Sequence, residues 1–334
     1  MNIIIPMAGS GKRLRPHTLT TPKPLFPIAG KTIVARLIED LTRLWATRIQ
    51  NVGFIVGDFG TEVEKSLISI SQDLGLTPHI FYQREPLGTA HAVYCAQELL
   101  DDDEVVIAFA DTLFSVEDLP QADVEGVIWV KEVEDPRAYG VVTVDERNYI
   151  TALVEKPENF VSNLAIIGIY YLKKGNVLKS ALEYIFEKKI KTKGEFQLTD
   201  ALSVLLSKGL SFMPGKVQQW LDCGNKASLL EASRVILSQF GEQSHIAASA
   251  TIENSLVLPP CFIGAYTSIK NSIVGPFVSI GEYGIVENSI VQDSIFRDQV
   301  WVSNAHLNHS IVGNKAAYQG QPHQINLGDY SSIN

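Results

Sequence analysis

A loop rich in glycine and cationic residues, "MAGSGKRLRPHT" (7–18), follows the first apolar segment of the chain, "NIIIP" (2–6). Backbone N–H groups beside glycines, together with lysine and arginine side chains, are groups that bind phosphate oxygens. A P-loop is excluded, because Pro6 stands where its first glycine belongs and Arg13 where it needs Ser or Thr. The dinucleotide-binding pattern G-x-G-x-x-G is excluded as well, because Leu14 occupies its third glycine position. The loop therefore indicates a phosphate site of neither common kind.

A second candidate lysine follows in "TTPKPLFPIAGK" (20–31). Lys23 stands between two prolines, which stiffen its backbone on both sides. A rigidly held ammonium group suits a transition state in which charge develops on a phosphoryl group. A lysine that only promotes solubility would not need this setting. We therefore expect Lys23 to act in catalysis, whereas the role of Lys12 stays open between a phosphate contact and a solvated side chain.

Predicted strands and helices alternate from the start of the chain to about position 238, which favours an α/β domain with a doubly wound, mostly parallel sheet. Ligands of such sheets bind at the carboxyl ends of the strands. The glycine-rich loop follows the first strand and Asp111 ends a later one, so both belong at that edge. The predicted strands include 2–6, 52–57, 79–83 and 104–111, and the predicted helices are 32–45, 61–70, 88–100, 175–189, 197–207 and 225–239.

After position 245 the pattern changes to an aliphatic side chain at every sixth position. The tetrapeptide Asn-Ser-Leu-Val at 254–257 recurs as Asn-Ser-Ile-Val at 271–274 and again at 288–291, so the interval is the same both times. Hexads of this kind predict a parallel β-helix with three hexads in about one coil, and such coils bury their apolar face only by stacking. The predicted domains are a catalytic domain (1–238), a linker (239–245) and a β-helix with a C-terminal tail (246–334).

Composition excludes several classes of protein. The 334 residues are 46% hydrophobic and carry a net charge of −9, which disfavours a broad nucleic-acid surface. The three cysteines lie far apart, which argues against a disulfide framework or a zinc site and suits a reducing cytosol. The N-terminal apolar run is too short for a signal peptide, and no apolar run has membrane-spanning length. We expect a cytoplasmic protein with neither a nucleic acid nor a membrane as partner.

The segment "GSGKRLRPHTLTTPKPLFPI" resembles the signature of the sugar-1-phosphate nucleotidyltransferases, G-x-G-T-R-L-x-P-x-T-x-x-x-P-K-P. Further segments resemble family motifs in the same order: "YQREPLGTAHAV", "FADTLF", "AYGVV", "VEKP", "NLAIIGIYYL", "KGEFQLTDAL" and "QWLDCGN". The similarity covers about residues 1–238. It implies a Rossmann-like nucleotidyltransferase domain, here followed by a parallel left-handed β-helix, as in long glucose-1-phosphate thymidylyltransferase-like forms.

The resemblance implies a reaction and a set of site residues. A sugar-1-phosphate oxygen would attack the α-phosphate of a nucleoside triphosphate in line, with Mg²⁺ as cofactor and pyrophosphate as leaving group. Arg13 and Lys23 would be catalytic. The nucleotide would be bound by Ala8, Gly9, Gly11, Arg13, Gln83, Gly88 and Asp111, the sugar phosphate by Gly140, Glu155, Lys156 and Gly168, and the metal by Asp111 and Asp222.

Departures from the family pattern leave base and sugar open. Lys12 replaces the usual Thr, Ala110 a common Gly, and Asn225 follows Cys-Gly where Thr-Gly-Thr is common. The segment "PKPL" resembles the thymidylyltransferase and guanylyltransferase branches of the family. The segments "QREPLGTA" and "NLAIIGIYYL" favour dTTP and glucose 1-phosphate, with a mannose-1-phosphate guanylyltransferase or a uridylyltransferase as alternatives. His306 and His309 raise the alternative of a bifunctional enzyme with a β-helix acyltransferase, and an inactive regulatory subunit is a further alternative. Stacking of β-helix coils between subunits would give a homo-oligomer.

Overall fold

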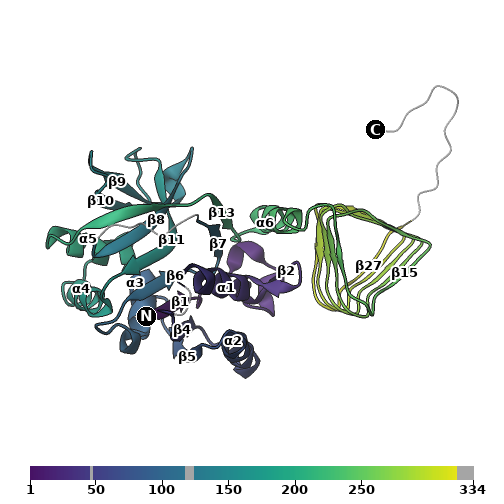
Figure 1. The fold of residues 1–334 in the computed structure, drawn as a ribbon, viewed down its shortest axis with the longest axis horizontal. Coiled ribbons are helices and arrows are strands. Elements are labelled where there is room, and N and C mark those ends of the chain that lie inside the picture. The colour runs from purple at the N-terminus through teal and green to yellow at the C-terminus, as the bar shows by residue number, and fades with distance from the viewer. Residues whose placement is uncertain (46–47, 117–123, 322–334) are drawn as a thin grey trace. The chain divides into compact units, whose positions relative to one another are not determined.

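The computed structural model describes residues 1–45, 48–116 and 124–321. Its residues group into two compact units (Figure 1). The first comprises Met1–Phe26 with Thr32–Asn225, and the second comprises Pro27–Lys31 with Lys226–Asn334. These units are groups of residues in mutual contact. The predicted limits of the catalytic domain at 238 and of the β-helix at 246 concern domains that fold separately, and they stay predictions.

A nine-stranded mixed sheet forms the centre of the first unit. Its main path runs β10-β9-β11-β6-β1-β4-β5, and β8 joins β11 to β12. The pairs of β1 with β4 and β6, β4 with β5, and β8 with β12 are parallel, whereas every pair made by β9 or β10, and those of β11, are antiparallel. The strands are β1 (Asn2–Pro6), β4 (Asn51–Val56), β5 (Thr77–Tyr82), β6 (Val105–Ala108), β8 (Gly126–Glu132), β9 (Gly140–Val144), β10 (Ile150–Glu155), β11 (Leu164–Leu172) and β12 (Phe212–Lys216).

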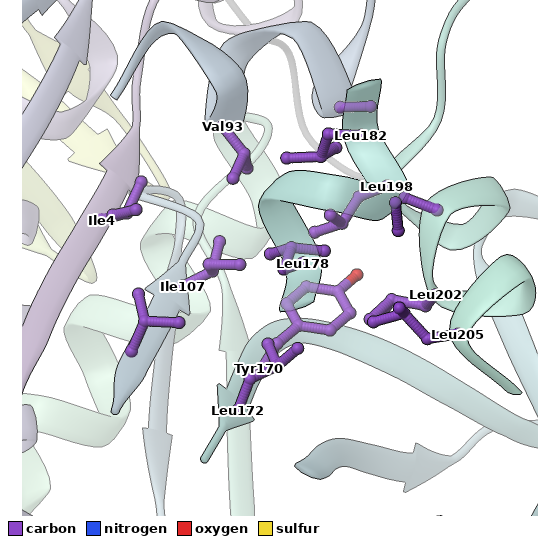
Figure 2. Packing of buried hydrophobic residues seen from close by; sticks show 14 of the residues in the cluster. Ile4, Val93, Ile107, Tyr170, Leu172, Leu178, Leu182, Leu198, Leu202 and Leu205 are labelled. Atoms are coloured by element: carbon purple, nitrogen blue, oxygen red, sulfur yellow. The ribbon is translucent and has the colours of Figure 1, made fainter. Parts of the chain in front are cut away.

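Helices cover both faces of this sheet, which confirms the predicted doubly wound α/β class. On one face, apolar side chains of α3, α4 and α5 pack with those of β1, β6 and β11 (Figure 2). On the other face, Trp45 at the end of α1 packs edge-on against Trp129 of β8, with ring centroids 5.6 Å apart. The helices are α1 (Ile33–Trp45), α2 (Thr61–Asp73), α3 (Thr89–Cys95), α4 (Gly175–Glu187) and α5 (Leu198–Ser207).

The helix predicted at 88–100 is shorter than expected. The α-helix α3 ends at Cys95, and a 3₁₀ turn at Gln97–Leu99 follows it. Apolar periodicity runs through both segments, since Ala96 and Leu99 are buried with α3, so the pattern alone does not mark the break.

Three sheets of short parallel strands form a β-helix in the second unit and confirm the fold that the hexads predict (Figure 1). Each strand pairs with its equivalent in the following coil, as in Ile252↔Ile269↔Val286, and the coil after these is slightly shorter, as in Val286↔Val302. Each hexad contributes one aliphatic side chain to the interior of the β-helix. Ile269, Val286 and Val302 are examples, and all three are fully buried.

The sheets and the remaining elements of the second unit follow in order. The first sheet is β14 (His245–Ile246), β17 (Cys261–Ile263), β20 (Val278–Ile280), β23 (Ser294–Phe296) and β26 (Ile311–Val312). The second is β15 (Thr251–Glu253), β18 (Ser268–Lys270), β21 (Ile285–Glu287), β24 (Trp301–Ser303) and β27 (Ala317–Gln319). The third is β16 (Leu256–Val257), β19 (Ile273–Val274), β22 (Ile290–Gln292) and β25 (His306–Asn308), and α6 (Lys226–Ser238) precedes all three.

The corners of the coils explain the repeated Asn-Ser pair. Asn254, Asn271, Asn288 and Asn304 all adopt a positive φ near 50°, a conformation that asparagine tolerates better than most residues. Their side chains form a ladder along the stack, in which Asn254 donates to Asn271 at 2.7 Å and Asn271 donates to Asn288 at 3.3 Å. The repeat therefore records both a turn and a contact between coils.

Candidate active site

The glycine-rich loop connects β1 to a short 3₁₀ turn at Lys12–Leu14. Gly11 has a left-handed backbone with φ of 58°, and Thr18 Oγ1 donates to its carbonyl oxygen at 2.8 Å. Leu14 is buried and anchors the turn, whereas Arg13 on the same turn is exposed. A Cβ at Gly9 would have no atom within 4 Å, so the fold itself does not demand a glycine there. The open space beside Gly9 is where a ligand could approach the backbone.

A cavity of about 250 Å³ lies at the carboxyl ends of β1 and β6. The ends of these two parallel strands bring the loop and Asp111 together, as the sequence predicts. Of the predicted nucleotide-binding residues, all but Arg13 line this cavity. Its lining includes Ala8, Gly9, Gly11, Lys23, Gln83, Gly88 and Asp111, together with Pro86, Thr89, Ala92, Phe109 and Glu195.

Lys23 forms an ion pair at the edge of this cavity. Its ammonium nitrogen lies 2.5 Å from Oδ2 of Asp111, and its side chain is only 13% exposed. The lysine begins a 3₁₀ turn, Lys23–Leu25, whose following proline, Pro24, is buried. The backbone on both sides of Lys23 is thus held, and its charge faces the carboxylate of Asp111.

Asp222 is brought to Asp111 by a two-stranded antiparallel sheet of β7 (Thr112–Ser115) and β13 (Gln219–Asp222). In this sheet Asp222 pairs with Thr112, and the N–H of Cys223 donates to the carbonyl oxygen of Asp111 at 2.9 Å. Gly224 N–H donates to Asp222 Oδ1 at 2.8 Å. Two carboxylates that lie far apart in the sequence therefore meet at one place.

The pKa of Asp222 is raised above its ordinary value, first by burial and next by the negative charge of Asp111. Arg13 and Lys23 oppose this shift. Two oxygen-donor carboxylates whose charges repel each other form a fitting donor set for a hard divalent cation such as Mg²⁺. Among the described residues no group of three or more His, Cys, Asp or Glu side chains is arranged to hold a metal. Oxygens of water and of a bound phosphate would complete such a site.

A second cavity, of about 300 Å³, adjoins the first through shared residues. Gly11 and Lys23 line both cavities, and Arg13, Lys12, Ser10 and Gly224 complete the second lining. This cavity collects cations and backbone groups, which are the groups that bind a polyphosphate. Lys12, whose role the sequence leaves open, is exposed and lies on this lining.

Gln83 follows β5 and turns its amide toward the start of α3. Its Nε2 donates to the carbonyl oxygen of Gly88 at 3.0 Å and lies 3.2 Å from Nδ1 of His91. Gly88 has φ of 120°, and a Cβ there would lie 2.3 Å from the carbonyl oxygen of Phe196. The segment before α3 is thus pressed against Phe196, and no other side chain than that of glycine fits at position 88.

The predicted sugar-phosphate residues lie on or directly after β9, β10 and β11 and line neither cavity. A Cβ at Gly140 would lie 3.1 Å from Oε2 of Glu155, which also accepts a hydrogen bond from Thr199. Lys156 Nζ lies 3.6 Å from Glu155 Oε1. Gly168 connects this group to the first cavity, because its carbonyl oxygen accepts from the N–H of Phe109, a cavity residue.

Several residues of the site were not predicted from the sequence. Thr89 and Glu195 line the first cavity, and Thr89 is tied to Gln197 by a hydrogen bond of 3.0 Å. The side chain of Tyr139 packs edge-on against Trp220 beside Asp222, with centroids 5.1 Å apart. The sequence did carry a signal for Thr89, because it is a polar residue at the N-terminus of the helix predicted at 88–100.

A model of the nucleotidyl transferase family matches residues 2–239, and the chain belongs to this family. It is 30% identical over 287 residues to a glucose-1-phosphate thymidylyltransferase of Streptomyces antibioticus, covering 79% of this chain and 78% of that one. It is 35% identical over 246 residues to the bifunctional protein GlmU of Methanocaldococcus jannaschii, covering 72% of this chain and 55% of that one.

Solved structures give the same result. A UDP-glucose pyrophosphorylase complexed with UDP-glucose matches with a TM-score of 0.60 and 25% identity, over 71% of this chain and 98% of that one. Within the nucleotidyl transferase family the chain is therefore a sugar-1-phosphate nucleotidyltransferase. Among the described residues, no helix has both the length and the apolar character needed to cross a bilayer.

Proposed function

We propose that the chain condenses dTTP with glucose 1-phosphate and releases pyrophosphate by in-line attack on the α-phosphate. One observation carries the proposal: the two adjoining cavities unite a glycine-rich loop, Arg13, Lys23 and Asp111. Such a reaction needs no covalent enzyme intermediate, so catalysis consists of positioning and neutralisation of charge. Glycine N–H groups and cations supply both.

Each charged group has a proposed role. Arg13 would bind the triphosphate in the second cavity, where its guanidinium can make two parallel hydrogen bonds to phosphate oxygens. Lys23, fixed beside Asp111, would stabilise the charge that develops on the reacting phosphates. Asp111 and Asp222 would hold Mg²⁺, which supplies neutralisation of the phosphate oxygens. Glu155 and Lys156 would bind the hydroxyls and the phosphate of the sugar.

The amide of Gln83 and the N–H of Gly88 support a choice among nucleobases. The Nε2 of Gln83 is used within the protein, so its Oε1 is left to accept a hydrogen bond. Within the part of the chain that the structure describes, the N–H of Gly88 has no acceptor and can donate. An acceptor beside a donor complements the edge of uracil, thymine or guanine, where a ring N–H adjoins a carbonyl. Cytosine and adenine present the opposite pattern.

Thymine is our choice among these three bases. The segment "PKPL" at 22–25 supports the choice of thymine, as does the similarity to a thymidylyltransferase. Uridylyl transfer is an alternative, because a similar solved structure is a UDP-glucose pyrophosphorylase with bound UDP-glucose. Guanylyl transfer is another, because the segment "PKPL" also resembles the guanylyltransferase branch.

A substrate panel tests the proposal. Pyrophosphate release would be measured with dTTP, UTP, GTP, CTP and ATP against glucose 1-phosphate and mannose 1-phosphate in the presence of Mg²⁺. We expect the highest kcat/KM with dTTP and glucose 1-phosphate. Activity with GTP alone would overturn our choice of base, and no activity with any pair would favour an inactive regulatory subunit.

One of the two histidines that suggest a β-helix acyltransferase, His309, makes a structural contact. His309 Nδ1 lies 2.8 Å from Oδ2 of Asp293, which also pairs with Arg234 of α6. Asp293 therefore links His309 of the β-helix to Arg234 of the neighbouring helix α6 within the second unit. Acetyl-CoA turnover by the full chain, lost on changing His306 or His309 to Ala, would support the bifunctional alternative.

A homo-oligomer remains part of the proposal. On the third sheet of the β-helix, Leu256, Ile273 and Ile290 stand side by side in register and point to solvent. A continuous aliphatic stripe of this kind is the surface that a second copy of the β-helix would cover.

A further inference from the structure

We propose that His91 is a positioning residue for nucleobase recognition, which holds the amide of Gln83 in the orientation that accepts a hydrogen bond from the base. The proposal rests on the proposed function, because it concerns the base of the nucleotide substrate. His91 lies on the first turn of α3, shortly after Gly88. Its Nδ1 lies 3.2 Å from the Nε2 of Gln83.

The orientation of the Gln83 amide follows from its neighbour on the backbone. A carbonyl oxygen only accepts hydrogen bonds, so the group 3.0 Å from the oxygen of Gly88 must be the amide nitrogen. The amide nitrogen carries two protons, and the second can reach Nδ1 of His91. Nδ1 must then hold a lone pair. In this contact the ring proton of His91 is therefore on Nε2.

Reversing the amide would turn Oε1 of Gln83 toward the carbonyl oxygen of Gly88, which is itself an acceptor. With the ring proton of His91 on Nε2, the reversed amide would lose the contact with Nδ1 as well. With both protons of Nε2 engaged, Oε1 is the polar atom that Gln83 offers to the cavity it lines. Without His91 the amide keeps one contact in place of two, and its orientation is less well fixed.

Aromatic packing holds the imidazole where this contact requires it. The ring of Phe186 in α4 meets the His91 ring edge-on, with centroids 6.4 Å apart and an angle of 78°. Phe186 also packs edge-on against Phe196, at 4.9 Å, and the backbone of Phe196 presses on Gly88. His91 and Gly88 are therefore braced by the same pair of phenylalanines, and the groups that set the amide of Gln83 are held together.

Two variants of His91 separate the hydrogen bond from the packing. In His91→Asn, Oδ1 stands two bonds from Cβ, as Nδ1 does in histidine, and retains an acceptor. In His91→Leu, a methyl group of similar position accepts nothing. Both variants lose the aromatic ring, so any difference between them reports the acceptor.

The readout is discrimination between bases, measured by competition of UTP or dTTP against CTP with the full chain and glucose 1-phosphate. We expect His91→Leu to lower the ratio of kcat/KM values for UTP over CTP by about fivefold, as loss of one neutral hydrogen bond implies, chiefly through KM for UTP. We expect His91→Asn to keep the ratio within about twofold of wild type. Equal ratios in wild type and in a folded His91→Leu variant would overturn the proposal, as would an equal loss in both variants.

A measurement on the unmodified protein does not depend on the variants folding. Long-range ¹H–¹⁵N correlation spectra distinguish the two neutral tautomers of a histidine. We expect His91 as the Nε2–H form at neutral pH, and a proton on Nδ1 would overturn the proposal. Failure of the proposed function would look different: wild type would then form no nucleotide-sugar with any triphosphate, whatever the tautomer of His91.

Discussion

The two lysines near the start of the chain, Lys12 and Lys23, differ in what surrounds them. Lys23 is nearly buried and paired with Asp111, whereas Lys12 is exposed on the rim of the second cavity. We expect Lys23→Ala to lower kcat by about a hundredfold or more, the scale of losing one fixed charge at a transition state. Lys12→Ala is the matched control, and we expect it to change kcat less than about threefold because an exposed lysine is strongly screened. Pyrophosphate release measures both, and equal losses in the two variants would contradict the assignment.

A second prediction at the scale of single residues concerns the effect of Asp222 on stability. Its pKa is raised in the folded protein, so the stability that this group contributes is present below its ordinary value of 3.8 and is lost as pH rises through the raised value. Ionised Asp222 therefore destabilises the metal-free protein at pH 7. We expect Asp222→Asn to raise the Tm of metal-free protein at pH 7, since Asn keeps an oxygen for Gly224 N–H.

Two further conditions check the explanation for Asp222. The difference in Tm between Asp222→Asn and wild type should shrink below about pH 4, where the carboxyl group is neutral. Adding Mg²⁺ should raise the Tm of wild type more than that of the variant, because the metal binds only the ionised pair. A lower Tm for the metal-free variant at pH 7 would show that the hydrogen bonds of Asp222 outweigh the cost of its charge.

At the scale of elements, two of the glycines that line the first cavity, Gly9 after β1 and Gly88 before α3, have different physical roles. A Cβ at Gly9 meets no protein atom, whereas a Cβ at Gly88 collides with the backbone of Phe196. We expect Gly9→Ala to leave Tm within about 1 °C of wild type, because surface changes without new contacts have little effect. Its KM for the triphosphate should rise at least about tenfold, because the methyl group occupies space that the ligand needs.

Gly88→Ala should behave in the opposite way. The methyl group forces the start of α3 away from Phe196 and takes a φ of 120°, which L-residues rarely adopt. We therefore expect a loss of about 2 kcal/mol in the free energy of unfolding, measured by denaturant titration, together with a higher KM. Unchanged stability of Gly88→Ala would mean that the contact with Phe196 is loose in solution.

The same elements indicate how much the sequence could predict. Local signals were sufficient for the glycine-rich loop, for Lys23 between its prolines and for the hexads, since each depends on residues near one another in the chain. Strand direction was not accessible: nothing in the apolar run of β11 reveals that it pairs antiparallel with β6 and β8. Contacts such as that of Thr89 with the distant Gln197 arise only when the sheet assembles, so the lining they complete was missed.

At the scale of the whole molecule, the exposed stripe on the third sheet of the β-helix predicts self-association. Leu256, Ile273 and Ile290 are 53%, 39% and 43% exposed, and their strands place them in one row. Single exposed aliphatic residues are ordinary, but a row on a flat sheet is a surface that water covers poorly. We expect wild type to be an oligomer by light scattering coupled to size exclusion, and Ile273→Glu with Ile290→Glu to be monomeric, because charges would be buried without partners.

Ile285 supplies the matched control for this experiment. It is 39% exposed, as Ile273 is, but it lies on β21 in the second sheet. Ile285→Glu should therefore leave the oligomer intact, and neither substitution should lower Tm by more than a few degrees, because no core side chain is removed. A monomeric wild type, or dissociation by Ile285→Glu to the same extent, would mean that the stripe on the third sheet does not mediate association. If the double variant is monomeric and fully active in pyrophosphate release, the β-helix serves assembly rather than the chemistry of the first unit.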